Sequence, residues 1–139
     1  MSDGPWEFEH SIECGVPRAF AWNYWTNPAN WDDPPARFEF DGPFAVGTRL
    51  TTLLPGQRLQ SVIREIVEGR EALIEMELMC ATLGFLWRFE EVAKNRTKIT
   101  QAIGLRGEGA AELVEQAKAL EQSVPQGMKK LAAAIEREW

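Results

Sequence analysis

The sequence is poor in the features that mark membrane-spanning and nucleic-acid-binding proteins. It contains no run of about eighteen apolar residues, so it predicts no transmembrane helix. Its 15 basic residues are outnumbered by 21 acidic ones, which gives a net charge of −6. This charge disfavours binding to nucleic-acid backbones and to anionic membrane surfaces, since both attract clusters of Lys and Arg. We therefore expect no nucleic-acid partner and no membrane span.

Groups that bind metals or form disulfides are equally scarce. Two cysteines, Cys14 and Cys80, are too few for a zinc site of four thiolates or for a disulfide framework. Asp32 and Asp33 have no His, Cys or spaced carboxylates nearby, which is typical of a solvated loop. The sequence therefore predicts no metal and no cofactor. Residues 1–6 contain neither the basic region nor the apolar segment of a signal peptide, so we predict a cytoplasmic protein.

Apolar and aromatic side chains are what the chain has in quantity. Of its 139 residues, 45% are hydrophobic and six are tryptophans. This composition predicts a folded protein rather than a disordered one. The length predicts a single domain over residues 1–139. The tryptophans fit two interpretations, a bulky aromatic core or the wall of an apolar pocket.

A long amphipathic helix is predicted at residues 110–138. Apolar residues recur there at steps of three and four, which places them on one stripe of a helix. They are Leu113, Ala117, Leu120, Val124, Met128, Leu131, Ile135 and Trp139. Pro125 interrupts the helix, because its ring removes a donor and crowds the carbonyl four residues back. We therefore expect a kink within residues 121–127.

Seven strands and two short helical segments are predicted ahead of that helix. Trp6–Cys14 alternates apolar and polar residues, as a half-buried strand does. A short helix is expected at Arg18–Trp25, followed by a helical turn through Trp31. Six further strands are expected at residues 37–41, 48–54, 59–67, 72–80, 85–90 and 98–105. For the strands at 48–54 and 59–67, the pattern leaves the inward face undecided.

The two strands that flank residues 81–84 predict their own register. Pairing Leu78 with Trp87 sets apolar side chains together on one face and places Glu77 opposite Arg88 on the other. Short turns between consecutive strands predict an antiparallel meander. One face of this sheet is polar, so the other must be covered by the long helix. The sequence thus predicts an α+β fold, a curved antiparallel sheet wrapped around the C-terminal helix.

This order of elements resembles the START-like, helix-grip (SRPBCC) superfamily, and within it the polyketide cyclase/dehydrase-like branch. The resemblance covers about residues 5–138 and is carried by the motifs at residues 16–20 (VPRAF), 27–31 (NPANW) and 42–48 (GPFAVGT). It implies a strongly bent, seven-stranded sheet that grips the helix, with a cavity between them. Members of this superfamily bind lipids, sterols, polyketides, hormones or other apolar molecules. Some are cyclases or dehydratases, some are carriers, and one branch activates a chaperone.

The main functional hypothesis is that the protein binds a small hydrophobic ligand between the sheet and the C-terminal helix. Large apolar side chains with few polar groups are typical of a ligand pocket. The candidate binding residues are Phe8, Tyr24, Trp25, Ile74, Met76, Leu78, Phe85, Trp87, Phe89, Gln101, Ile103, Leu120, Val124 and Met128. The chain is expected to be a monomer or a homodimer.

Two alternatives stay open beside ligand binding. In an enzyme of the polyketide cyclase or dehydratase type, His10 would be the catalytic base, because it is the only histidine and is predicted to face inward. Gln101 and Tyr24 would then supply hydrogen bonds to the substrate. A chaperone-activator-like interaction module would instead need an exposed apolar patch on the outer sheet.

Overall fold

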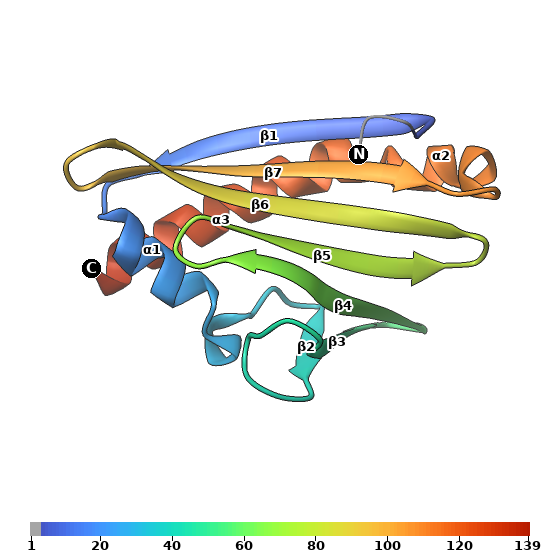
Figure 1. Ribbon diagram of the computed structural model, residues 1–139, viewed down its shortest axis with the longest axis horizontal. Coiled ribbons are helices and arrows are strands. Elements are labelled where there is room, and N and C mark those ends of the chain that lie inside the picture. The colour runs from blue at the N-terminus through green and yellow to red at the C-terminus, as the bar shows by residue number, and fades with distance from the viewer. Residues whose placement is uncertain (1–3) are drawn as a thin grey trace.

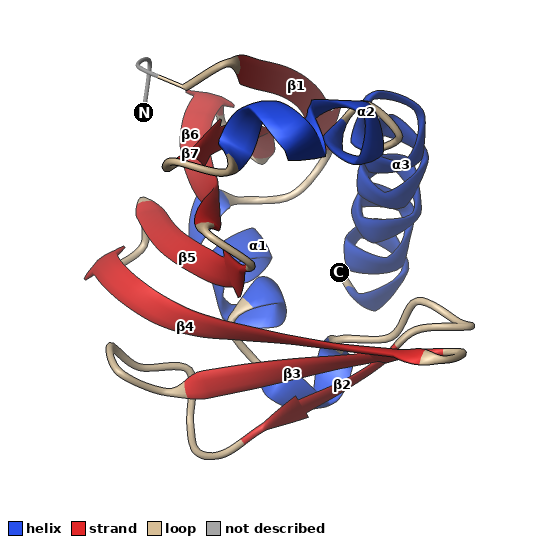
Figure 2. Cartoon of the chain, turned by 90° about the vertical axis from the view of Figure 1, so that its right-hand side faces the viewer, coloured by secondary structure: helices blue, strands red, loops and turns tan. Residues whose placement is uncertain are grey.

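Residues 4–139, the part of the chain that this computed structural model describes, form a curved sheet of seven antiparallel strands with helices on its concave side (Figure 2). Residues 1–3, which begin the segment considered above for a signal peptide, lie outside the described residues. Within residues 4–139, no helix combines the length and hydropathy of a membrane span.

Every predicted strand is present, and the predicted α+β architecture is confirmed (Figure 1). The strands are β1 (Trp6–Cys14), β2 (Arg37–Phe40), β3 (Arg49–Leu54), β4 (Gln57–Val67), β5 (Glu71–Leu78), β6 (Ala81–Ala93) and β7 (Arg96–Arg106). They lie side by side in the order β1-β7-β6-β5-β4-β3-β2, so the first strand pairs with the last.

The helices lie where the sequence predicts them, apart from the break in the C-terminal helix. They are α1 (Arg18–Trp25), η1 (Pro28–Asn30), η2 (Ala110–Leu113), α2 (Val114–Ala117) and α3 (Leu120–Glu138). The predicted interruption at Pro125 is wrong, since α3 runs through this residue as one helix. The kink expected within residues 121–127 stays a prediction. A break in the C-terminal helix falls at residues 118–119. The Pro125 ring crowds the carbonyl of Glu121 in the first turn of α3, and the helix is discontinuous just before that turn.

Two hydrogen bonds fasten α3 along β1. The Trp6 indole nitrogen donates to Glu121 Oε2 at 2.8 Å, near the start of α3. The backbone nitrogen of Gly15 donates to Glu136 Oε2 at 2.7 Å, near its end. Figure 2 shows the result, with α3 beside β1 and the opposite edge of the sheet, β2 and β3, curving round below it.

The register predicted for β5 and β6 is wrong, although its inward face is right. Leu78 pairs with Ala81 rather than with Trp87, a shift of six residues. Met79 and Cys80 close the hairpin, and Cys80 takes a positive φ of 57°. Because a shift of six residues is even, the same side chains stay on the inner face.

The inward faces of β3 and β4, which the sequence left undecided, follow from their pairing. Leu50 lies opposite Ser61, and Ser61 lies opposite Met76 on the inner face of β5. Leu50, Ser61 and Ile63 are all buried. The register shifts between Ile63 and Glu65, so the alternation breaks inside β4. That bulge explains why a strict alternation could not identify the face.

Candidate functional site

The register brings most of the predicted binding residues together in rows across the inner face. One row runs through Ile74, Phe85, Ile103 and Phe8 on β5, β6, β7 and β1. The next row runs through Trp87, Gln101 and His10. Residues from four strands thus form one continuous wall, although they lie far apart in the sequence.

Burial divides this wall into two parts. Phe89 is 1% exposed and Ile103 is also buried. Met76, Leu78 and Phe85 face the same side of the sheet, yet they are only half-buried. A side chain under a covering helix normally loses its contact with solvent. The middle of the inner face is therefore an apolar surface that the helices leave partly accessible.

The α3 residues in the predicted set lie on its apolar stripe. Val124 and Met128 are buried, while Leu120 is half-buried. Ala132 is buried too, although the predicted stripe omits it. Trp139, the last residue of the predicted stripe, is exposed.

The polar candidates His10 and Gln101 lie directly opposite each other across β1 and β7. Gln101 is only 7% exposed, and its amide makes no hydrogen bond to another described residue. Among residues 4–139, the side-chain polar atom that is fully occluded without a partner is Nε of Arg88. A buried amide needs a hydrogen-bond partner, so a water or a ligand would satisfy the Gln101 amide. Tyr24, the third polar candidate, is half-buried on α1.

An aromatic cluster around Trp25 fills the end of the wall beneath α1. Trp25 is 3% exposed. Its ring centroid lies 5.0 Å from that of Trp87, 5.4 Å from that of Phe89 and 4.9 Å from that of Phe44. The Trp31 indole nitrogen also donates to the Trp25 carbonyl oxygen at 2.6 Å. Trp25 and Phe89 are thus core residues here, whereas Trp87 borders the accessible part.

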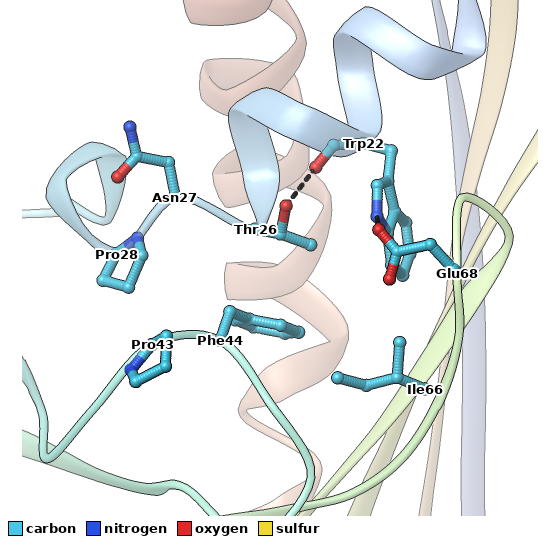
Figure 3. Close-up of a pocket in the computed structure, with 8 residues that line it drawn as sticks. All are labelled: Trp22, Thr26, Asn27, Pro28, Pro43, Phe44, Ile66 and Glu68. Atoms are coloured by element: carbon cyan, nitrogen blue, oxygen red, sulfur yellow. Dashed lines mark hydrogen bonds between the residues drawn. The ribbon is translucent and has the colours of Figure 1, made fainter.

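A cavity of about 340 Å³ lies beside α1 (Figure 3). It lies between the end of α1, η1, the β2–β3 loop and the β4–β5 turn. The lining residues are Trp22, Thr26, Asn27, Pro28, Pro43, Phe44, Ile66 and Glu68. None of them is in the predicted binding set. Most belong to loops without hydrophobic periodicity, and the motifs at residues 27–31 and 42–48 were the one sequence signal near them.

The two cysteines differ sharply in exposure. Cys14 is fully buried, and this burial, together with the nearby Glu136 carboxylate, raises the pKa of its thiol to about 11. Cys80 is exposed at the β5–β6 turn. A thiol that stays protonated at neutral pH is a poor nucleophile. No group of three or more His, Cys, Asp or Glu that could hold a metal occurs within the described residues.

The bent sheet, the short helices after β1 and the long helix along β1 define a helix-grip fold. No protein-family model matches the sequence, and the search of curated proteins found no match. The polyketide cyclase/dehydrase-like branch stays a prediction.

Solved structures from several organisms share this fold. Norcoclaurine synthase from Thalictrum flavum, in complex with dopamine and hydroxybenzaldehyde, superposes with a TM-score of 0.74 at 15% identity, over 96% of this chain and 87% of that one. Ara h 8.0201 superposes with a TM-score of 0.66 at 20% identity, over 96% of each chain. A structural-genomics target from Nitrosomonas europaea gives a TM-score of 0.72 at 12% identity, over 95% of each chain. At these identities the likeness concerns the fold.

Proposed function

We propose that the protein binds a small, mostly apolar molecule between the inner face of the sheet and α3. The observation that carries this proposal is the partial exposure of Met76, Leu78, Phe85 and Trp87 on the inner face. Burying such side chains is favourable by about 25 cal/mol per Å² of apolar surface. A ligand that covers them gains this free energy without rearranging the fold.

The polar group at Gln101 supports a ligand that is apolar but not purely hydrocarbon. Its amide lies on the inner wall without a protein partner, beside Trp87 and opposite His10. A carbonyl or hydroxyl on the ligand would satisfy this amide. Norcoclaurine synthase, which shares the fold, holds two small aromatic molecules. That likeness supports a ligand of similar size here.

Native mass spectrometry of freshly purified protein is the primary test. We expect a mass increment above the chain mass, and release of an apolar metabolite on denaturation. The absence of any increment, together with no saturable binding of apolar fluorescent probes, would contradict the proposal.

A pair of matched variants tests the location of the ligand. Leu78→Trp enlarges a half-buried side chain on the inner face of β5, so it should abolish ligand retention while the protein stays folded. Leu73→Trp makes the same change on the outer face of the same strand and should retain the ligand. Equal retention by both variants would place the ligand elsewhere.

A second candidate function is catalysis of the polyketide cyclase or dehydratase type. The observation that favours it is the direct pairing of His10 with Gln101 on the inner face. His10 would accept a proton from the substrate, and Gln101 and Tyr24 would donate hydrogen bonds to the developing oxyanion. Conversion of a candidate polyketide should then be lost in His10→Ala while tryptophan fluorescence still reports binding. Unchanged turnover in that variant would contradict the role of His10.

The chaperone-activator alternative gains no support from the outer face of the sheet. Ion pairs lie on this face, among them Arg64–Glu75 at 3.0 Å and Arg88–Glu9 at 3.5 Å, beside the half-buried row of Leu73, Leu86 and Ala102. A docking surface for a protein partner is normally a contiguous apolar patch. These charges support ligand binding over that alternative.

A further inference from the structure

We propose that the cavity beside α1 is a second binding site, and that it takes a small organic cation with an apolar body. Its volume of about 340 Å³ equals that of about eleven water molecules at about 30 Å³ each. A ligand of about ten non-hydrogen atoms fits such a volume. The proposal does not depend on ligand binding at the inner wall, because the two sets of residues do not overlap.

The walls of this cavity are mostly apolar and are held in place by the core. Figure 3 shows Trp22 and Phe44 on adjacent sides, with Ile66 below Trp22. The Trp22 ring packs edge-on against Phe89, with centroids 5.4 Å apart and planes at 87°. Phe44 packs in the same manner on Trp25, with centroids 4.9 Å apart. Because buried rings hold both walls, the cavity does not depend on a ligand for its shape.

The charge in this cavity is a single carboxylate, that of Glu68. The Trp22 indole nitrogen donates to Glu68 Oε1 at 3.2 Å, which holds the carboxylate at the edge of the indole. No basic side chain among residues 4–139 pairs with it within 4.0 Å, and none lines the cavity. A cation in this cavity would meet the Glu68 carboxylate together with the Trp22 and Phe44 rings, whose quadrupoles also attract positive charge.

Two of the remaining polar groups in the lining are engaged within the protein. The Thr26 hydroxyl donates to the Trp22 carbonyl oxygen at 2.8 Å, and the Asn27 side-chain oxygen accepts from the backbone nitrogen of Ala29 at 3.1 Å. The ligand therefore meets one charged group, that of Glu68, among rings, prolines and the Asn27 amide. An anion of the same shape would meet the Glu68 charge with no compensating cation.

Titration with benzyltrimethylammonium, followed by two-dimensional NMR of the backbone amides and tryptophan indoles, tests this proposal. We expect saturable shifts at the Trp22 indole and at the Thr26 and Phe44 amides, with a dissociation constant of about 1 mM for so small a ligand. Phenylacetate, which reverses the charge, should cause no saturable shift at these groups.

Matched variants test whether the Glu68 carboxylate contributes to binding of the cation. Glu68→Gln keeps the shape of the side chain and should weaken binding by about two- to fivefold, because Glu68 is exposed and water screens its charge. Glu65→Gln removes a charge from an exposed residue of β4 outside the cavity and should bind as the wild type does. Phe44→Leu removes a ring without touching the Trp22–Glu68 hydrogen bond, and should also weaken binding. It serves as the second test if Glu68→Gln fails to fold.

Weaker binding in Glu68→Gln, with Glu65→Gln unaffected, supports the proposal, and Phe44→Leu takes its place only if Glu68→Gln fails to fold. Binding by folded Glu68→Gln equal to that of the wild type overturns it, as does the absence of saturable shifts. Shifts confined to the Gln101 side-chain amide would also overturn it, because they would place the cation at the inner wall.

Discussion

Phe89 and Phe85 lie on the same face of the same strand, four residues apart, yet their environments differ. Phe89 is 1% exposed, because the Trp22 and Trp25 rings of α1 pack on it with centroids 5.4 Å away. Phe85 is half-buried, because α1 does not reach it and α3 lies closest to β1. The same alternation of residues therefore produces a solid core at one end of the sheet and an accessible wall in its middle. The position of the covering helix decides whether an inward-facing residue belongs to the core or stays accessible.

Truncation of the two phenylalanines should give the largest measurable difference between the closed core and the accessible wall. Phe89→Ala should lower the free energy of unfolding by about 3–5 kcal/mol, since it removes a ring from a closed core. Phe85→Ala should lower it by about half as much, because part of its ring is exposed in the folded protein. Urea denaturation of both variants measures the difference. Equal losses would mean that Phe85 also belongs to the closed core.

Enlarging inner-face side chains tests the same division in the other direction. Ile99→Phe overpacks a residue that is fully buried beside Phe89, so it should destabilise the protein by about 1–3 kcal/mol. Met76→Phe should be nearly neutral, because the half-buried Met76 borders accessible space. Thermal unfolding of the two variants provides the measurement. A large loss in Met76→Phe would show that the middle of the wall is solid.

The buried thiol of Cys14 makes the stability of the closed core depend on pH. The pKa of Cys14 is raised from an ordinary value of 9.0 to about 11, so the folded protein holds this proton more tightly than the unfolded chain. The stabilisation is complete below pH 9 and is lost as the pH rises through 11, by roughly 3 kcal/mol in total. Wild type should therefore lose stability relative to Cys14→Ala over this window. If the difference in the free energy of unfolding between the wild type and Cys14→Ala did not change with pH, the raised pKa of Cys14 would be contradicted.

Chemical labelling gives an independent check on the same thiols. A maleimide should react at once with the exposed Cys80 and with Cys14 only on unfolding. Rapid modification of both cysteines in the folded protein would be inconsistent with a closed core at Cys14.

The smallest expected effect concerns the contact between α3 and β1. The helical pattern places Glu121 among the water-facing residues, but its carboxylate accepts the Trp6 indole hydrogen bond at 2.8 Å. Glu121→Ala should therefore lower the free energy of unfolding by about 1 kcal/mol. Glu112→Ala, an exposed change in η2, is the control and should do little. Identical stabilities would mean that this hydrogen bond contributes nothing measurable.

Local patterns were sufficient to predict most elements of the fold. The alternation in Trp6–Cys14 and the apolar spacing in Arg18–Trp25 gave the bounds that the structure has. Each pattern reflects which side of one element meets the core, and that is a local property of the chain. The register of β5 and β6 was not predictable in this way, because registers six residues apart present the same faces.

The two candidate sites also differ in how far the sequence could predict them. The inner wall, with His10 opposite Gln101, follows from strand parity once the strands are paired, so its members could be named from the sequence. The cavity beside α1 combines Trp22, Phe44 and Glu68 from three separate segments, and no periodicity links them.

The sequence by itself determined the order of the elements, the inward face of most strands and the apolar stripe of α3, because each depends on spacing along one segment. Only the tertiary structure decided which inward residues are core and which stay accessible, since that depends on where α1 and α3 cross the sheet. It also decided the break before Leu120 and the place of Glu68 beside Trp22. Contacts between residues far apart in the chain set these features, and hydrophobic periodicity carries no information about them.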